Sequence, residues 1–258
     1  MAEINDLRDF AKQQGVELAK PKDLVSELID NLTARYGYSS AEIKANFDQI
    51  LNEAEQEAHT LYRKHEQEYC KRVLGLYISH LVKEGGIKDP NDVGVELGAN
   101  VSLLDKFFLS LAQGRKARAG GAFETFHNDL FRGLGYPFSE QALINGKPDF
   151  LLPSAGHYQK NASDCIIFTV KRTVRERWRL VVTEGTRGLA YFLATIDKDL
   201  SRNQLEEMLA NRVHLVCPHD IKQQQSAYRS APNVLSFQDF FQDYLDPAMD
   251  RWKRNGVI

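Results

Sequence analysis

The stretch CIIFTVK, Cys165–Lys171, is rich in β-branched and aromatic residues and predicts a buried strand. A shorter strand is expected before it at Asp149–Leu152, and a helix after it over Thr173–Leu189. Two more strands and an intervening helix are expected further along the chain, at Ala190–Ile196, Val213–Cys217 and Gln204–Leu209. Strands that alternate with helices are joined by right-handed crossovers and form a largely parallel segment of sheet. The sequence therefore predicts an α/β core.

The chain before this core has a helical pattern. Ser39-Ser40-Ala41-Glu42 carries the residues of a capping box, which marks the start of a helix. Apolar residues then recur at three- and four-residue steps, on one helix face: Ile43, Phe47, Ile50, Leu51, Ala54, Ala58, Leu61 and Tyr62. The pattern stops at Gly85-Gly86, and a turn at Asp89–Asp92 separates it from a further helical run over Val101–Leu111. We predict a helical N-terminal part over residues 1–110 and the core over residues 111–258.

Gly120 and Gly121 mark a change in the sequence pattern. A new helix is expected after them over Phe123–Leu134, with Gly135 in the position that follows a helix C-terminus. Glu124 would then lie at the start of this helix. A final amphipathic stretch, Phe237–Trp252, is expected to cover one face of the sheet.

Composition excludes several classes of protein. The 258 residues are 43% hydrophobic and 26% charged, which is typical of a soluble globular protein with a sizeable core. No apolar run approaches the ~18 residues that span a bilayer, and the polar N-terminus gives no support for secretion. Cys70, Cys165 and Cys217 are odd in number and lack CxxC spacing. We therefore expect core thiols in a reducing cytoplasm instead of a disulfide framework or a zinc site.

Basic charge is local. The formal net charge is −2, yet the segment KRTVRERWR over Lys171–Arg179 holds five basic residues against the single acid Glu176. A second basic group, Arg115, Lys116 and Arg118, has no acid within it. Local basic patches of this kind are where a nucleic acid would bind a protein of near-neutral net charge.

The residues that could carry chemistry are acids and one lysine, since the chain has no GxSxG, GxxxxGK or HExxH pattern. They are Glu124, Asp149, Lys171 and Glu184. Carboxylates bind Mg²⁺ through hard oxygens, the metal acidifies a water, and a lysine faces the charge that develops on a phosphate. Adjacent strand ends would bring Asp149 and Lys171 together. Taken singly, a Pro-Asp turn and a lysine at a strand end fit a structural role equally well.

The helix expected after Lys171 adds a possible recognition function. Thr173 is a good N-cap, so Arg175, Glu176 and Arg177 would lie in the first turn, where a helix favours anions. Arginine binds guanine O6 and N7 and glutamate accepts from cytosine N4, so an Arg-Glu-Arg triplet can read G·C pairs. Glu176 also fits a capping box with Thr173, and Arg175 and Arg179 also fit a solvated helix face.

Three longer segments carry a resemblance: QGRKARAGGAFETFHNDLF (Gln113–Phe131), FSEQALINGKPDFLLPSAGHY (Phe138–Tyr158), and FTVKRTVRERWR (Phe168–Arg179) with TEG at Thr183–Gly185. Together they resemble the EcoRII C-terminal-domain family of type II restriction endonucleases, within the larger PD-(D/E)XK nuclease group. They cover about a fifth of the chain and none of residues 1–110. The resemblance implies a mixed central sheet flanked by helices, with a helical N-terminal part.

The same resemblance implies site residues. Asp149 matches the family's metal-binding aspartate, Lys171 its catalytic lysine, and Glu184 a displaced second acid, with Mg²⁺ as the cofactor. Glu124 matches a helical glutamate near the site. The position two before Lys171, usually Asp or Glu in PD-(D/E)XK enzymes, is Thr169 here. Glu184 is expected to supply the missing carboxylate, and the site depends on that substitution.

DNA contacts are also implied. Arg175-Glu176-Arg177 matches the triplet that recognises the CC and GG halves of the target, and Gln113 matches a contact to a central base pair that the family flips out. Backbone contacts are expected from Arg115, Lys116, Arg118, Arg172 and Arg179. Tyr62 is a candidate to stack on a flipped base, and Tyr36 another, although both fit a helix core. Tyr158 matches a family tyrosine, with no role beyond packing or a phosphate contact.

The resemblance implies a homodimer that cuts double-stranded DNA at a CCNGG or CCWGG site, 5′ of the first C, beside a partner methyltransferase. It leaves open N against W at the centre and dimer against tetramer. Two other classes remain. A structure-specific repair or recombination nuclease would share the acids and the lysine, but the Arg-Glu-Arg triplet argues against it. A non-catalytic sequence-specific DNA-binding protein would not need four site residues intact.

Overall fold

The computed structural model describes residues 4–37, 39–144, 147–174 and 190–258. They form two compact units. We call Met1–Val25 with Gln56–Ala122 the helical unit, and Ser26–Glu55 with Phe123–Ile258 the sheet unit. The units are interleaved along the chain, because residues 26–55 belong with the sheet. The functional boundary expected near residue 110 stays a prediction.

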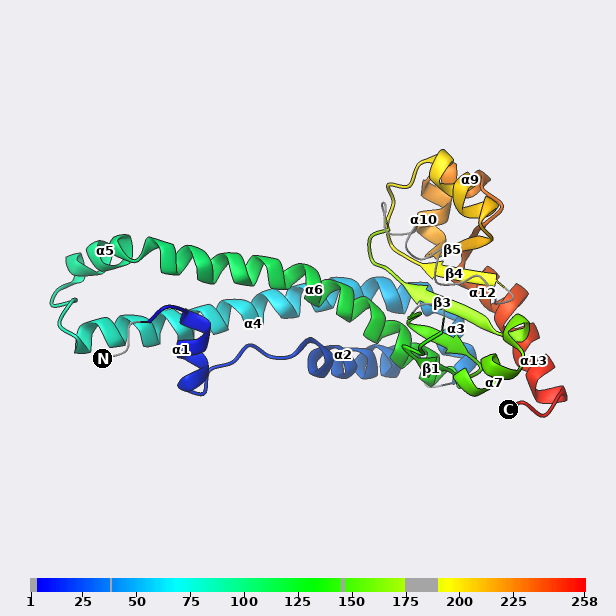
Figure 1. The fold of residues 1–258 in the computed structure, drawn as a ribbon, viewed down its shortest axis with the longest axis horizontal. Helices are drawn as coiled ribbons and strands as arrows, with labels where there is room; N and C mark the ends of the chain where they lie inside the picture. The colour runs from blue at the N-terminus through cyan, green and yellow to red at the C-terminus, as the bar shows by residue number, and fades with distance from the viewer. Residues whose placement is uncertain (1–3, 38, 145–146, 175–189) are drawn as a thin grey trace. The chain divides into compact units, whose positions relative to one another are not determined.

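The helical unit is built on α1 (Leu7–Gln13), α5 (Pro90–Ala99) and parts of two long helices, α4 (Phe47–Lys83) and α6 (Val101–Gly133). In this unit α4 and α6 lie side by side (Figure 1), and Tyr69 of α4 meets Phe107 of α6 with ring centroids 6.2 Å apart. The expected turn at Asp89–Asp92 is instead the start of α5. Asp89 caps the helix, and Asp92 completes a capping box. Pro90 also favours a helix start, because proline suits the first helical position. Among the described residues, no helix is long and apolar enough to cross a membrane.

The long helices correct two sequence expectations. The run that begins at the Ser39 capping box divides at Asn46 into α3 (Ser40–Ala45) and α4. Conversely, α6 is continuous through Gly120 and Gly121, so Glu124 lies inside a helix and not at its start. A glycine costs a helix about 1 kcal/mol. The helical turns before and after Gly120 and Gly121 therefore offset the cost of the two glycines, and α6 stays continuous.

The sheet unit contains six strands in the order β1-β2-β3-β4-β5-β6. The strands are β1 (Ser139–Glu140), β2 (Phe150–Leu152), β3 (Ile166–Val170), β4 (Ala190–Ala194), β5 (Val213–Cys217) and β6 (Val234–Ser236). β1, β2 and β3 pair antiparallel, whereas β3, β4, β5 and β6 pair parallel. The four strands expected from the sequence are confirmed, and so is the parallel segment from β3 to β5.

Further helices complete this unit, although residues 21–25, at the start of α2, belong to the helical unit. The remaining elements are α2 (Pro21–Tyr36), α7 (Ala155–Lys160), η1 (Ala162–Asp164), α9 (Arg202–Ala210), α10 (His219–Gln224), α11 (Ser226–Ser230), α12 (Phe237–Phe240), the π-helix η3 (Phe241–Leu245) and α13 (Asp246–Arg254). α6 ends as expected, since Gly135 has φ +74° and Tyr136 N–H donates to Phe131 O at 3.1 Å.

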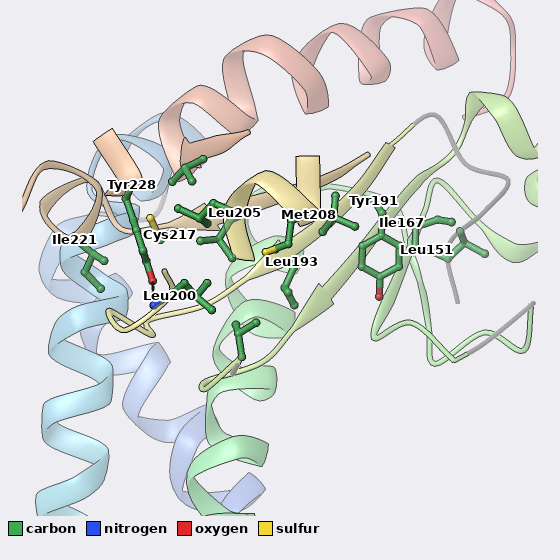
Figure 2. Packing of buried hydrophobic residues seen from close by; sticks show 14 of the residues in the cluster. Leu151, Ile167, Tyr191, Leu193, Leu200, Leu205, Met208, Cys217, Ile221 and Tyr228 are labelled. Atoms are coloured by element: carbon green, nitrogen blue, oxygen red, sulfur yellow. Dashed lines mark hydrogen bonds between the residues drawn. The ribbon is translucent and has the colours of Figure 1, made fainter. Parts of the chain in front are cut away.

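Each face of the sheet has its own core. On one face, Ile167, Leu193 and Leu215 pack with residues of α9 and α10, including Met208 and Ile221 (Figure 2). Aromatic rings form the other core: Phe131, Phe150, Phe168, Phe192, Phe237 and Phe240. The expected amphipathic C-terminal stretch supplies part of this second core. The sheet is therefore held between two layers, and the polar side chains at its strand ends are held in place by packing on both faces.

Two of the three cysteines lie in the core, as expected. All three thiols are free, with Cys165 and Cys217 buried and Cys70 partly exposed. Burial raises the pKa of both buried thiols to about 12, so neither ionises near neutral pH.

Candidate active site

An acid and a lysine meet where β2 begins and β3 ends. The two strands run antiparallel, with Phe150 opposite Phe168, so the residue before β2 lies beside the residues that end β3. Lys171 Nζ lies 3.0 Å from Asp149 Oδ2, as the strand order predicted. The Asp149 side chain is 9% exposed, whereas the Lys171 side chain is 34% exposed. The buried carboxylate of Asp149 is therefore paired with the ammonium group of Lys171, which remains partly exposed to solvent.

The backbone of β3 fixes this carboxylate. Val170 N–H donates to Asp149 Oδ2 at 2.7 Å, and Asp149 N–H donates to Thr169 Oγ1 at 3.3 Å. Thr169 is 1% exposed and occupies the position where the broader nuclease pattern has an acid. Its hydroxyl serves as an acceptor for Asp149, so the substitution stabilises the aspartate backbone without adding a negative charge.

Gln141 joins Glu124 to the same place, and nothing in the sequence pattern singled it out. Its backbone N–H donates to Asp149 O at 3.0 Å, and its amide Nε2 donates to Glu124 Oε1 at 3.1 Å. Gln141 has φ +47°, a left-handed conformation that non-glycine residues seldom adopt. One strained residue thus contacts both predicted acids, although Glu124 and Asp149 lie on different elements.

Arg172, expected to contact the DNA backbone, is held by a second residue that the sequence did not single out. Its Nε donates to Glu55 Oε2 of α4 at 2.9 Å, and the Glu55 side chain is 14% exposed. α4 carries no motif at Glu55, and the pair joins residues 117 positions apart. Only the folded chain brings them together.

His127, one turn after Glu124 on α6, belongs to the aromatic core. It is fully buried among phenylalanines, and its Nδ1 lies 2.8 Å from Phe123 O. Burial lowers the pKa of this imidazole to about 4, so the ring is neutral near neutral pH.

Other predicted residues lie elsewhere. Gln113, Tyr62 and Arg115 belong to the helical unit, where Arg115 pairs with Glu66 at 2.5 Å and Gln113 is exposed. Lys116 and Arg118 lie within α6, and their side chains are outside the described part of the chain. Tyr158 packs in the core that contains Ile167, and Tyr36 donates to Glu53. Four basic or acidic candidates and the second acid fall outside the described residues: Arg175, Glu176, Arg177, Arg179 and Glu184.

A divalent cation fits the chemistry of the described site only in part. Both described contacts to the Asp149 carboxylate fall on Oδ2, which leaves Oδ1 as a hard oxygen donor of the kind Mg²⁺ prefers. Over residues 4–37, 39–144, 147–174 and 190–258, no cluster of three or more His, Cys, Asp or Glu could hold a metal. A complete ligand set therefore needs a further donor.

A mixed sheet with an acid and a lysine joined at its strand ends is the arrangement that the family resemblance implied. Two solved structures similar to this chain are restriction endonucleases in complex with DNA. Metal-depleted Ecl18kI with uncleaved, modified DNA aligns with a TM-score of 0.81 and 25% identity, covering 95% of this chain and 84% of that one. The PspGI–substrate DNA complex aligns with a TM-score of 0.61 and 20% identity, covering 90% and 96%. The predicted restriction-endonuclease-like fold is confirmed.

Residues 81–241 match the sequence model of the family described as EcoRII C terminal. The chain belongs to this family, as the resemblance implied. The type II restriction enzyme SsoII of Shigella sonnei is 29% identical over 199 residues, 70% of this chain and 62% of SsoII. The type II restriction enzyme EcoRII of Escherichia coli is 35% identical over 119 residues, 43% of this chain and 29% of EcoRII. The chain thus spans less than two thirds of either relative.

Proposed function

We propose that the chain is a type II restriction endonuclease that hydrolyses double-stranded DNA with Mg²⁺. The observation that carries the proposal is the 3.0 Å contact between Lys171 Nζ and Asp149 Oδ2 at adjoining strand ends. Membership of the EcoRII C-terminal family supports the same reaction. So does the solved complex in which metal-depleted Ecl18kI holds uncleaved DNA.

In this mechanism the chain orients the reacting groups. Val170 N–H fixes Asp149 Oδ2, so Oδ1 would be available to hold a cation, with Glu184 as the proposed second ligand. Bound Mg²⁺ supplies a water of lowered pKa and neutralises charge on the phosphate. The Lys171 ammonium, 34% exposed, faces the phosphate and stabilises the charge that develops there. Gln141 holds the Glu124 carboxylate beside this group.

Recognition and assembly complete the proposal. Arg175-Glu176-Arg177 reads the G·C pairs of a CCNGG or CCWGG site, Gln113 contacts the central pair, and Tyr62 stacks on a flipped base. Arg172 and the basic residues near Arg115 contact phosphates. The chain acts as a homodimer, since a near-palindromic target suits two-fold symmetry. Residues 1–110 then serve dimerisation and DNA contacts, and residues 111–258 serve catalysis. The protein acts in the cytoplasm, where a partner methyltransferase protects the host sites.

The test is incubation of the protein with methylation-free phage DNA and Mg²⁺, followed by mapping of the fragment ends. Parallel reactions contain EDTA, Lys171→Ala, or the matched control Lys253→Ala, which removes an exposed lysine of α13. We expect discrete fragments that begin at CC-N-GG sites. These fragments should be absent with EDTA and with Lys171→Ala, and present with Lys253→Ala. A smear indicates that the reading of the Arg-Glu-Arg triplet is wrong. Binding without cleavage indicates a non-catalytic DNA-binding protein.

A further inference from the structure

Residues Lys171–Val174, which follow β3, are hydrogen-bonded to the end of β4 and to the residues after it. We call Lys171–Val174 the fastened segment. Lys171 N–H donates to Ala194 O at 2.9 Å, which extends the parallel pairing by one bond. Thr195 Oγ1 then donates to Arg172 O at 3.2 Å, and Val174 N–H donates to Asp197 Oδ2 at 2.8 Å. Beyond the last backbone hydrogen bond between the two strands, the side chains of Thr195 and Asp197 thus make the bonds that hold the segment.

Asp197 is itself fixed from several sides. It is 8% exposed, its N–H donates to Thr195 Oγ1 at 3.0 Å, and its Oδ1 accepts from Asp199 N–H at 3.1 Å. Tyr228 hydroxyl donates to Asp197 O at 2.7 Å and accepts from Leu200 N–H at 3.3 Å, beside which it lies in Figure 2. A buried carboxylate is stable only when its oxygens are hydrogen-bonded, and here each oxygen accepts a backbone N–H. The arrangement therefore has one well-defined geometry.

The placement of this arrangement gives it significance. Lys171 begins the fastened segment and Val174, which is 0% exposed, ends it. Arg175, the first residue of the proposed base-reading triplet, follows Val174 directly in the chain. A shift of Val174 relative to Lys171 would therefore move the point at which the chain continues into the proposed triplet, and misplacement of reacting groups by about 1 Å can reduce a rate by ~100-fold.

We propose that Thr195 and Asp197 are positioning residues that link base reading to cleavage by holding Val174 at a fixed place relative to Lys171. The inference rests on the proposed function. Neither side chain needs to touch DNA for this role. Their effect is on discrimination between target and near-target sites, because a segment held loosely allows Lys171 to act when the triplet is imperfectly seated.

The test compares variants of nearly unchanged shape. Asp197→Asn has a single side-chain carbonyl oxygen, so one of the two N–H donors, from Val174 or Asp199, loses its acceptor. Thr195→Val removes the hydroxyl, and Thr195→Ser retains it. Asn233→Ala is the control for stability: Asn233 is 1% exposed and bonds Leu205 O and Val213 O, away from the fastened segment.

Cleavage rates are measured on duplexes with the site mapped for the wild type and on duplexes with each single-base-pair substitution. In Asp197→Asn and Thr195→Val, the ratio of target to near-target rates is expected to fall ~10-fold or more. Thr195→Ser and Asn233→Ala are expected to keep the wild-type ratio.

Unchanged ratios in both Asp197→Asn and Thr195→Val, with rates that only follow stability, overturn the positioning role. If the wild type gives no discrete fragments, the proposed function fails, and the inference fails with it. These two outcomes are distinguished by the wild-type reaction alone.

Discussion

Replacement of Asp48 by asparagine should make the sheet unit more stable, and only at neutral or alkaline pH. Asp48 lies in the first turn of α4, where its Oδ2 accepts from His219 N–H at 2.8 Å. Its Oδ1 is buried, and no hydrogen-bond partner is found for it within the described part of the chain. Burial, with a smaller contribution from the carboxylates of Asp220 and Asp239, raises the pKa of Asp48 to about 6. Lys222 is paired with Asp239 at 2.7 Å.

The magnitude follows from this shift. The pKa rises from 3.8 to about 6, roughly two units, and each unit corresponds to about 1.36 kcal/mol. Because the side chain is only partly buried, solvent screening reduces the expected effect to about 1–2 kcal/mol. The folded protein holds the proton more tightly than the unfolded chain, so this contribution is full below about pH 4 and is lost as pH rises through 6.

Urea denaturation at pH 4 and pH 8 measures the effect, with tryptophan fluorescence as a probe because Trp252, one of the two tryptophans, is buried in the sheet unit. Asp48→Asn should raise the free energy of unfolding at pH 8 by about 1–2 kcal/mol and much less at pH 4. Asp250→Asn, an exposed position of α13, is the matched control. An equal effect of Asp48→Asn at both pH values, or a loss of stability at pH 8, would refute the reasoning.

Three other changes have defined outcomes. Gln141→Asn tolerates the left-handed backbone but shortens the amide that binds Glu124, so kcat for DNA cleavage should fall about 10-fold while the Kd for DNA is unchanged. Arg172→Ala should reduce the salt slope of DNA binding by about 1, measured by titration of a fluorescent duplex at several salt concentrations. Phe131→Ala removes a ring that contacts Phe150 and Phe168 at 0% exposure, so urea denaturation should show a loss of about 3–5 kcal/mol. Phe108→Ala, at 47% exposure, should cost far less.

Local patterns were sufficient for the elements that pack on both faces. β5 has the predicted bounds, Val213–Cys217, and β3 lies inside the predicted Cys165–Lys171, because a buried strand must be apolar along its length. β1 has two residues and β6 has three, and neither was predicted, although β2, also three residues long, was. Their existence depends on neighbouring strands that the local sequence does not specify.

In the candidate site, too, some contacts could be predicted from the sequence and others could not. The meeting of Asp149 and Lys171 could be predicted, since each ends or begins a strand with a strong signal. Gln141, Glu55 and Asp197 could not, because each acts through a contact made by the tertiary fold. Gln141 takes a backbone conformation that glutamine does not favour, and Glu55 is an ordinary helical residue until Arg172 folds against it.

The interleaving of the two units has a consequence for folding during synthesis. Ser26 bonds Asp129, Asp48 bonds His219, and Lys44 bonds Asp246, at sequence separations of 103, 171 and 202 residues. Contacts this distant incur loop-closure entropy before they stabilise anything, and they slow folding. Residues 26–55 therefore leave the ribosome long before their partners exist. Phe47 of this segment packs against Phe237 and Phe241, so its apolar contacts in the core cannot form until the C-terminal helices have been made.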